Sequence, residues 1–223
     1  MEKEDKKIIE TAVVKPPLSL WENGEEYRIL SQQDEEILDE GIRKIVAYMQ
    51  NNNGYGLQDT EKDLLYAESQ QLWNEYAKHL RRVKYTFYIN RKQWQYLTDL
   101  LRDKLEYDVN TIFFAIELTN MLGSWAIEGT NKDDVSLKGY ESDATETTYM
   151  YHLISKHKVK GLSNSTYVFS QILLRIGEIS KIINYYDNHA KQLSTDIQNW
   201  VASFEDPESG DETTTQVQDQ NPS

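Results

Sequence analysis

Histidines and carboxylates are the first residues to consider for chemistry, because this 223-residue chain contains no cysteine. A cysteine nucleophile, a Cys-ligated zinc site and a disulfide framework are therefore excluded. None of the four histidines (His79, His152, His157 and His189) has a Glu three residues before it, so the Glu-x-x-His ligand pairs of di-iron bundles are absent. The sequence also lacks phosphate-binding, nucleophile-elbow and zinc-protease motifs. We expect no catalytic residue, no metal site and no cofactor.

Basic side chains interleaved with aromatic rings lie between residues 78 and 104, where eight Lys and Arg residues have only two Asp among them. Basic groups that contact phosphates, beside rings that stack on bases, are typical of single-strand nucleic-acid binding. The candidate nucleic-acid-binding residues are Lys78, Arg81, Arg82, Lys84, Arg91, Lys92, Tyr88 and Trp94. The alternative, which we favour, places the rings in the core and leaves the basic side chains as a solvated face.

The net charge of −13 is carried by the two ends of the chain. Residues 1–40 contain 12 acidic and 5 basic side chains, residues 204–223 contain 6 acidic and no basic ones, and residues 41–203 contain 19 of each. A nucleic-acid mimic needs a folded surface dense in carboxylates, so the balanced middle of the chain argues against one. Neither a signal-peptide core nor a run of roughly 18 apolar residues is present, so we expect a cytoplasmic protein with no membrane partner.

Apolar residues recur at helical spacing through most of residues 31–203, which predicts a mainly α-helical domain. Ser31 followed by Asp34 is typical of a helix N-cap, and this first helix is expected to end in the run from Asn51 to Gly54. Further helices are expected from residue 59 or 60 to about 83, after Asn90, over about 109–122 and over about 144–156. The helix over 109–122 is strongly apolar, and we expect it to be the most buried element.

Two segments between these helices are expected to be irregular. Residues 85–89 are rich in strand-forming residues, but no partner strand is apparent, so an extended connector is predicted. Residues 126–142 are polar and contain Gly129 and Gly139, which is typical of a surface loop.

The strongest pattern follows Ser163, where apolar residues succeed one another at alternating steps of three and four. This heptad repeat predicts one long helix over about 163–203, in which the run from Tyr185 to Asn188 is a point where it could kink. The predicted partner-binding face consists of Phe169, Ile172, Ile176, Ile179, Ile183, Tyr186, Leu193, Ile197 and Trp200. Antiparallel packing inside the chain's own bundle is the preferred interpretation, and self-association as a coiled coil is the competing one.

The chain is therefore predicted to have three parts. Pro16 and Pro17 forbid helix near the N-terminus, so residues 1–30 are expected to form an extended arm that docks on its own domain or on another subunit. Residues 31–203 are the helical domain. Residues 204–223 contain a single aliphatic side chain, Val217, and predict a disordered acidic tail.

These patterns together predict an all-α fold, an irregular helical bundle with one long C-terminal helix. The leading functional hypothesis is a non-enzymatic assembly or adaptor protein that binds another protein or itself as a homo-oligomer. A composition rich in Tyr, Asn and Ile, without any chemical motif, would suit a phage or other viral structural or accessory protein, located in the cytoplasm or the virion. The alternative is a nucleic-acid-associated accessory factor that uses the basic and aromatic segment.

Overall fold

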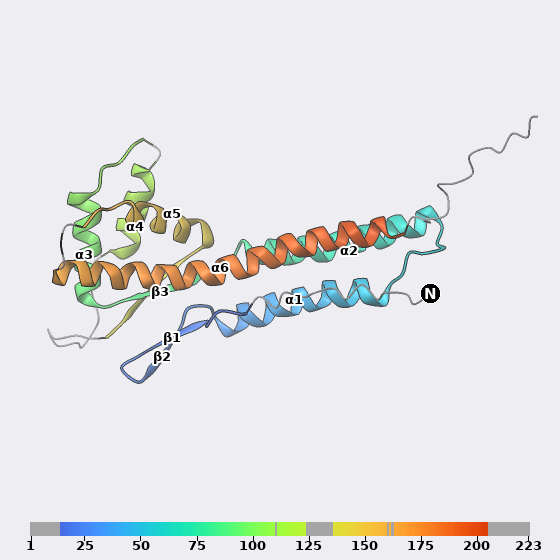
Figure 1. The fold of residues 1–223 in the computed structure, drawn as a ribbon, viewed down its shortest axis with the longest axis horizontal. Helices are drawn as coiled ribbons and strands as arrows, with labels where there is room; N and C mark the ends of the chain where they lie inside the picture. Colours follow the sequence, from blue (N-terminus) through green and yellow to red (C-terminus); the bar gives the residue numbers. More distant parts are fainter. Residues whose placement is uncertain (1–13, 110, 124–135, 160, 162, 205–223) are drawn as a thin grey trace, which may run out of the picture.

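The computed structural model describes residues 14–109, 111–123, 136–159, 161 and 163–204 and is mainly helical, as predicted (Figure 1). Its helices are α1 (Gln32–Asn51), α2 (Asp59–Leu80), α3 (Arg91–Asp99), the π-helical turn η1 (Leu100–Lys104), α4 (Ile112–Leu122), α5 (Ala144–Ser155) and α6 (Asn164–Ala202). Its strands are β1 (Ser19–Glu22), β2 (Glu25–Arg28), β3 (Tyr85–Ile89) and β4 (Lys138–Ser142). In these parts of the chain, no helix is both long and apolar enough to span a bilayer.

The long helix α6 organises the molecule (Figure 1). Its 39 residues form one continuous helix through Tyr185–Asn188, about 58 Å long at 1.5 Å per residue. The C-terminal half of α6 lies along α1 and α2, and we call these three segments the rod. The N-terminal half carries α3 and α5, with α4 packed outside them, and we call these four segments the head. The long helix over about 163–203 is confirmed, and it is unbroken.

Helix N-termini are set by side chains that accept a backbone N–H, as the sequence predicts for three of them. The Ser31 hydroxyl accepts from the Asp34 N–H, the Asn90 side chain from Gln93 and the Ser163 hydroxyl from Thr166. Each such cap satisfies a donor that the first turn leaves unpaired. The starts of α1, α3 and α6 are therefore fixed by local sequence.

The predicted connector over 85–89 is a strand with a partner, so that prediction is wrong. β3 pairs antiparallel with β4, and Phe87 lies opposite Tyr140. Tyr85, Phe87 and Ile89 alternate inward and are fully buried. The loop predicted over 126–142 is likewise wrong at residues 138–142, which form β4. The error is understandable, because Tyr140 is the one large apolar side chain of this five-residue strand and gives no clear alternation.

Residues 14–30 are docked on the rest of the chain, and they contain a hairpin that the sequence prediction missed. β1 and β2 pair across a turn in which Asn23 and Gly24 have φ of 53° and 82°, the conformation that an Asn-Gly hairpin turn requires. Beyond the hairpin, Leu30 forms an antiparallel bridge with Tyr85. Residues 1–13 lie outside the described residues.

The far end of the rod is closed by aromatic side chains. The ring of Phe204 packs edge-on against Trp200, with 4.7 Å between the ring centroids, and Phe204 is 3% exposed. A Cβ at position 54 would stand 2.3 Å from Phe204 Cγ, so glycine there lets the ring dock. Phe204 therefore belongs to the folded part, although the predicted tail begins with it. The remainder of that tail, 205–223, lies outside the described residues.

Candidate functional site

The predicted partner-binding face of α6 lies inside the protein. Eight of its nine residues are at most 6% exposed, and Trp200 is half-buried with its Nε1 donating to the Asn52 carbonyl at 3.3 Å. The elements that contact α6 most extensively are α1, α2, α3, α5 and β3 of the same chain. The face is thus occupied by the chain's own core. Its binding to a second protein stays a prediction that would require the bundle to open.

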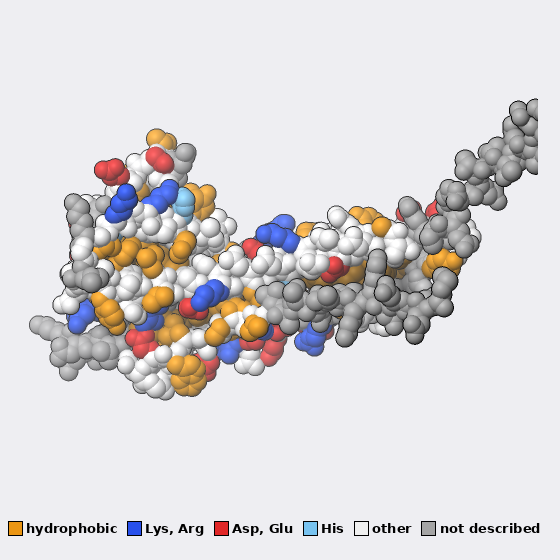
Figure 2. Space-filling view, viewed as in Figure 1, with side chains coloured by type: hydrophobic (Ala, Val, Ile, Leu, Met, Phe, Trp, Pro, Cys, Tyr) orange, Lys and Arg blue, Asp and Glu red, His pale blue; other side chains and the backbone are white. Residues whose placement is uncertain are grey.

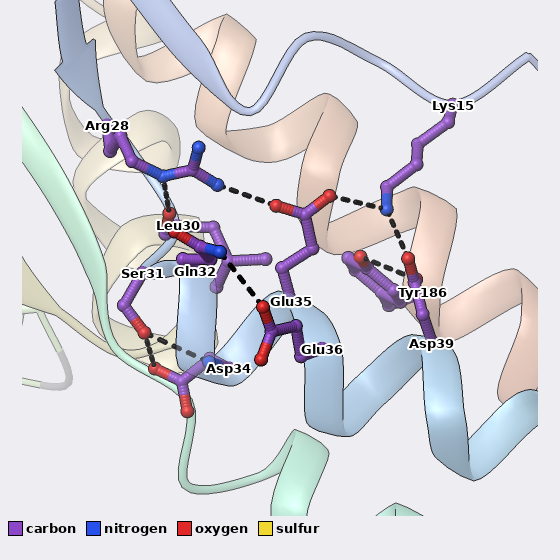
Figure 3. A network of polar contacts seen from close by, with 10 residues as sticks. All are labelled: Lys15, Arg28, Leu30, Ser31, Gln32, Asp34, Glu35, Glu36, Asp39 and Tyr186. Atoms are coloured by element: carbon purple, nitrogen blue, oxygen red, sulfur yellow. Dashed lines mark hydrogen bonds and ion pairs between the residues drawn. The ribbon is translucent and has the colours of Figure 1, made fainter.

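A network of ion pairs holds the N-terminal segment on the rod (Figure 3). Lys15 Nζ lies 2.9 Å from Glu35 Oε1 and 2.6 Å from Asp39 Oδ2, and Arg28 Nη2 lies 2.6 Å from Glu35 Oε2. The Tyr186 hydroxyl of α6 donates to Asp39 Oδ1 at 3.1 Å. Burial first, and then the Asp39 carboxylate, raise the pKa of Tyr186 well above its usual value, so the phenol stays protonated. These contacts tie residues 14–30 to their own chain.

The basic side chains of the predicted nucleic-acid segment all lie at the surface. Lys78, Arg81, Arg82, Lys84, Arg91 and Lys92 are exposed. One of them is engaged within the chain, because Lys84 Nζ lies 3.3 Å from both Asp143 Oδ2 and Glu146 Oε2. The exposed arginines and lysines lie before and after β3, at the end of α2 and the start of α3.

The aromatic rings of the same segment are engaged in packing. Tyr88 and Trp94 are half-buried; the Tyr88 hydroxyl donates to the Arg28 carbonyl at 3.1 Å, and Trp94 Nε1 donates to the Leu122 carbonyl at 3.2 Å. The Tyr88 ring also meets Tyr27 edge-on, at 5.2 Å between centroids. Stacking on a base would have to displace these contacts. The two rings are thus half-buried within the chain, while the basic side chains around them are exposed, and nucleic-acid binding by this segment stays a prediction.

The helix α4 presents an apolar face to solvent, which the sequence prediction missed. Val109 in the turn before α4 is 79% exposed, and Ile112, Phe113 and Ile116 on the helix are 42%, 66% and 51% exposed. Steps of three and four residues place Ile112, Phe113 and Ile116 on one side of the helix, and we call these three side chains, with Val109 before the helix, the α4 stripe. Figure 2 shows that hydrophobic side chains also gather at other points on the surface of the head. The prediction that 109–122 is the most buried element is therefore wrong.

The opposite side of α4 is buried and packs on α5, which positions the helix in the head. Ala115, Leu118 and Leu122 are buried, and the ring of Phe114 stacks on Tyr149 of α5 with 3.7 Å between centroids and 13° between planes. A cavity of about 40 Å³ lies between α4, β4 and α5. It is large enough for water and too small for an organic substrate. One side of α4 is thus packed on α5, and the other is largely exposed.

Among the described residues, no three His, Asp or Glu side chains lie close enough together to hold a metal ion. Comparison with known proteins gives no match, whether to a protein-family model, to a curated protein or to a solved structure. The α4 stripe is therefore the candidate functional site, and it rests on geometry alone. The sequence gives no signal for this exposed side, because the apolar residues of 109–122 lie around most of the helix, and such a pattern is typical of a buried helix.

Proposed function

We propose that this chain is a non-enzymatic helical assembly or adaptor protein that acts through protein–protein contacts. The observation that supports it is the α4 stripe, where Ile112, Phe113 and Ile116 on one side of α4, and Val109 before the helix, are exposed large apolar side chains. Burying them against a partner would be favourable by about 25 cal/mol for each Å² of apolar surface removed from water. Patches of this kind on soluble proteins are typical of binding surfaces.

The other helices of the head hold that surface in place. α4 packs on α5, and α5 packs on α6, which runs the length of the rod. An adaptor of this design would hold a partner at the head while the rod remains free. On composition alone, we extend the proposal to a phage or other viral structural or accessory protein, acting in the cytoplasm or in the virion.

Site-specific photo-crosslinking in the native host tests this proposal. A photoreactive phenylalanine at position 113 should form a covalent adduct with a protein, because that side chain is 66% exposed within the stripe. The matched control is the same photoreactive residue at Leu174, which is 59% exposed on the outer side of α6. Adduct at position 113 alone is the expected result. The proposal fails if position 113 gives no protein adduct, or if both positions give the same adducts.

A second candidate function is the nucleic-acid-associated accessory factor, which the exposed basic side chains favour. Arg81 and Arg82 at the end of α2 are two neighbouring exposed cations, whereas Lys84 is paired with Asp143 and Glu146. Binding to single-stranded DNA should then weaken steeply with salt and be lost in the double variant Arg81→Glu with Arg82→Glu. A chain that does not bind single-stranded DNA even at low salt excludes this function.

A further inference from the structure

We propose that residues 14–28 form a strap that detaches reversibly from the rest of the fold and thereby uncovers Tyr88. None of residues 14–28 is buried, whereas Ile29 and Leu30, which follow directly, are 2% and 0% exposed. Segments that bury few apolar side chains open at a lower free energy than the core of a protein does. The strap precedes Ile29 in the chain, so it can leave while Ile29 and Leu30 remain in the core.

Ion pairs and limited apolar packing hold the strap in place (Figure 3). Three of its charged side chains pair with α1 and α6: Lys15 with Glu35 and Asp39, Arg28 with Glu35, and Glu22 with Arg175. Its apolar packing is limited, because Leu18 and Leu20 are half-buried and Trp21 is 71% exposed. The paired side chains are all partly exposed to water, so dissolved salt screens their attraction. Salt should therefore loosen the strap.

The strap covers Tyr88 of β3, which is half-buried between the buried Phe87 and Ile89. The Tyr88 hydroxyl donates to the Arg28 carbonyl at 3.1 Å, and its ring meets Tyr27 edge-on at 5.2 Å between centroids. Both partners belong to the strap, so detachment removes both contacts and exposes the ring. Tyr88 is one of the two rings of the predicted nucleic-acid segment, and the strap would control access to it.

Amide hydrogen exchange on the full chain, followed by NMR, tests the proposal. The Ile29 and Leu30 N–H groups donate to the Leu18 carbonyl at 2.8 and 3.3 Å, so faster exchange of these two amides reports detachment. Raising the salt concentration from about 0.05 M to about 1 M should speed their exchange at least tenfold, because the Debye length falls to about 3 Å. The amides of Ile176 and Tyr186 in α6 should change less than twofold. Exchange at Ile29 that does not respond to salt overturns the proposal.

The pair of Glu22 with Arg175 allows a test by charge reversal and rescue. Glu22→Arg replaces attraction by repulsion and should speed exchange at Ile29 at least tenfold at low salt. The double variant Glu22→Arg with Arg175→Glu should recover most of the protection. The matched control is Glu26→Arg, which makes the same change of charge at an exposed position of the same hairpin and should have no effect. An equal effect of Glu26→Arg, or a double variant that does not recover, overturns attachment of the strap by charge.

Hydroxyl-radical footprinting tests whether the strap covers Tyr88. Tyr88 should be oxidised at least several-fold more in Glu22→Arg than in the wild type. Tyr76 is 3% exposed and its hydroxyl donates to the Tyr186 carbonyl inside the core, so its oxidation should not change. Faster exchange at Ile29 without stronger oxidation of Tyr88 overturns the strap as its cover. Neither readout involves nucleic acid, so both are independent of the second candidate function.

Discussion

The helices α6 and α4 both carry apolar residues at helical spacing, and the protein uses the two patterns differently. The predicted partner-binding face of α6, which we now call the α6 stripe, is buried by α1, α2, α3, α5 and β3, while the α4 stripe is largely exposed to water. The sequence pattern is stronger in α6, where it runs through 39 residues, than in α4, which has 11. The difference teaches that an apolar stripe indicates that a helix needs a partner, without saying whether that partner is in the same chain.

The largest expected effect is the difference in unfolding free energy between a substitution in the buried α6 stripe and one in the exposed α4 stripe. Ile176 of α6 is fully buried, so Ile176→Ala should lower the free energy of unfolding by about 2–5 kcal/mol through lost burial and a cavity. Phe113→Ala on the α4 stripe should change it by no more than about 0.5 kcal/mol. Urea denaturation followed by circular dichroism measures both. A loss for Phe113→Ala as large as that for Ile176→Ala would show that the stripe is packed.

A smaller effect is expected in α5, the helix that lies between α4 and α6. Asp143 caps it by accepting the Glu146 N–H at 2.9 Å, and Lys84 lies 3.3 Å away. Partial burial alone would raise the pKa of Asp143, but the backbone hydrogen bond and the Lys84 ammonium outweigh it and lower the pKa below its usual value. Asp143→Ala should therefore lower the free energy of unfolding by about 1 kcal/mol at pH 7.

The sign of the pH dependence follows from the lowered pKa of Asp143. A carboxylate with a lower pKa in the folded state stabilises the fold above its unfolded pKa of about 3.9, and that contribution is lost as the pH falls through the folded pKa. The stability difference between wild type and Asp143→Ala should thus shrink between about pH 5 and pH 3 in urea titrations. Asp143→Asn, which keeps a capping side chain without the charge, is the control. A difference that does not change with pH would contradict the role of the charge.

The smallest effect concerns the side of α6 that does not carry the stripe. A Cβ at Gly177 would meet no atom within 4 Å, although the neighbouring Ile176 is fully buried. Gly177→Ala should therefore raise the free energy of unfolding by about 0.5–1 kcal/mol, because alanine loses less backbone entropy in a helix. Thermal or urea unfolding measures the gain. A loss of stability would mean that position 177 is packed against another element.

Local sequence predicts the helices well because their starts and stops are encoded within a few residues. Ser31, Asn90 and Ser163 cap α1, α3 and α6, and the heptad repeat predicts α6 nearly to the residue. The β1–β2 hairpin is equally local and was missed, although the dipeptide Asn23-Gly24 is a strong hairpin signal.

Contacts between distant segments are harder to predict. The pairing of β3 with β4 joins segments far apart in the chain, such as Tyr85 and Ser142, and the short β4 shows no clear alternation of its own. The exposure of the α4 stripe depends on which side of α4 packs on α5, and a helix that is apolar all round does not specify that side. The candidate site therefore could not be found from periodicity, because periodicity describes one element at a time.

Hydroxyl-radical footprinting of the dilute protein tests the contrast between the stripes most directly, because each contains a phenylalanine. Phe113 of the α4 stripe is 66% exposed and Phe169 of the α6 stripe is 6% exposed. Mass spectrometry of one sample should find Phe113 oxidised at least several-fold more than Phe169, whose ring is enclosed by the head. Equal oxidation of the two rings, or stronger oxidation of Phe169, would contradict the burial of the α6 face in the core and the exposure of the α4 stripe.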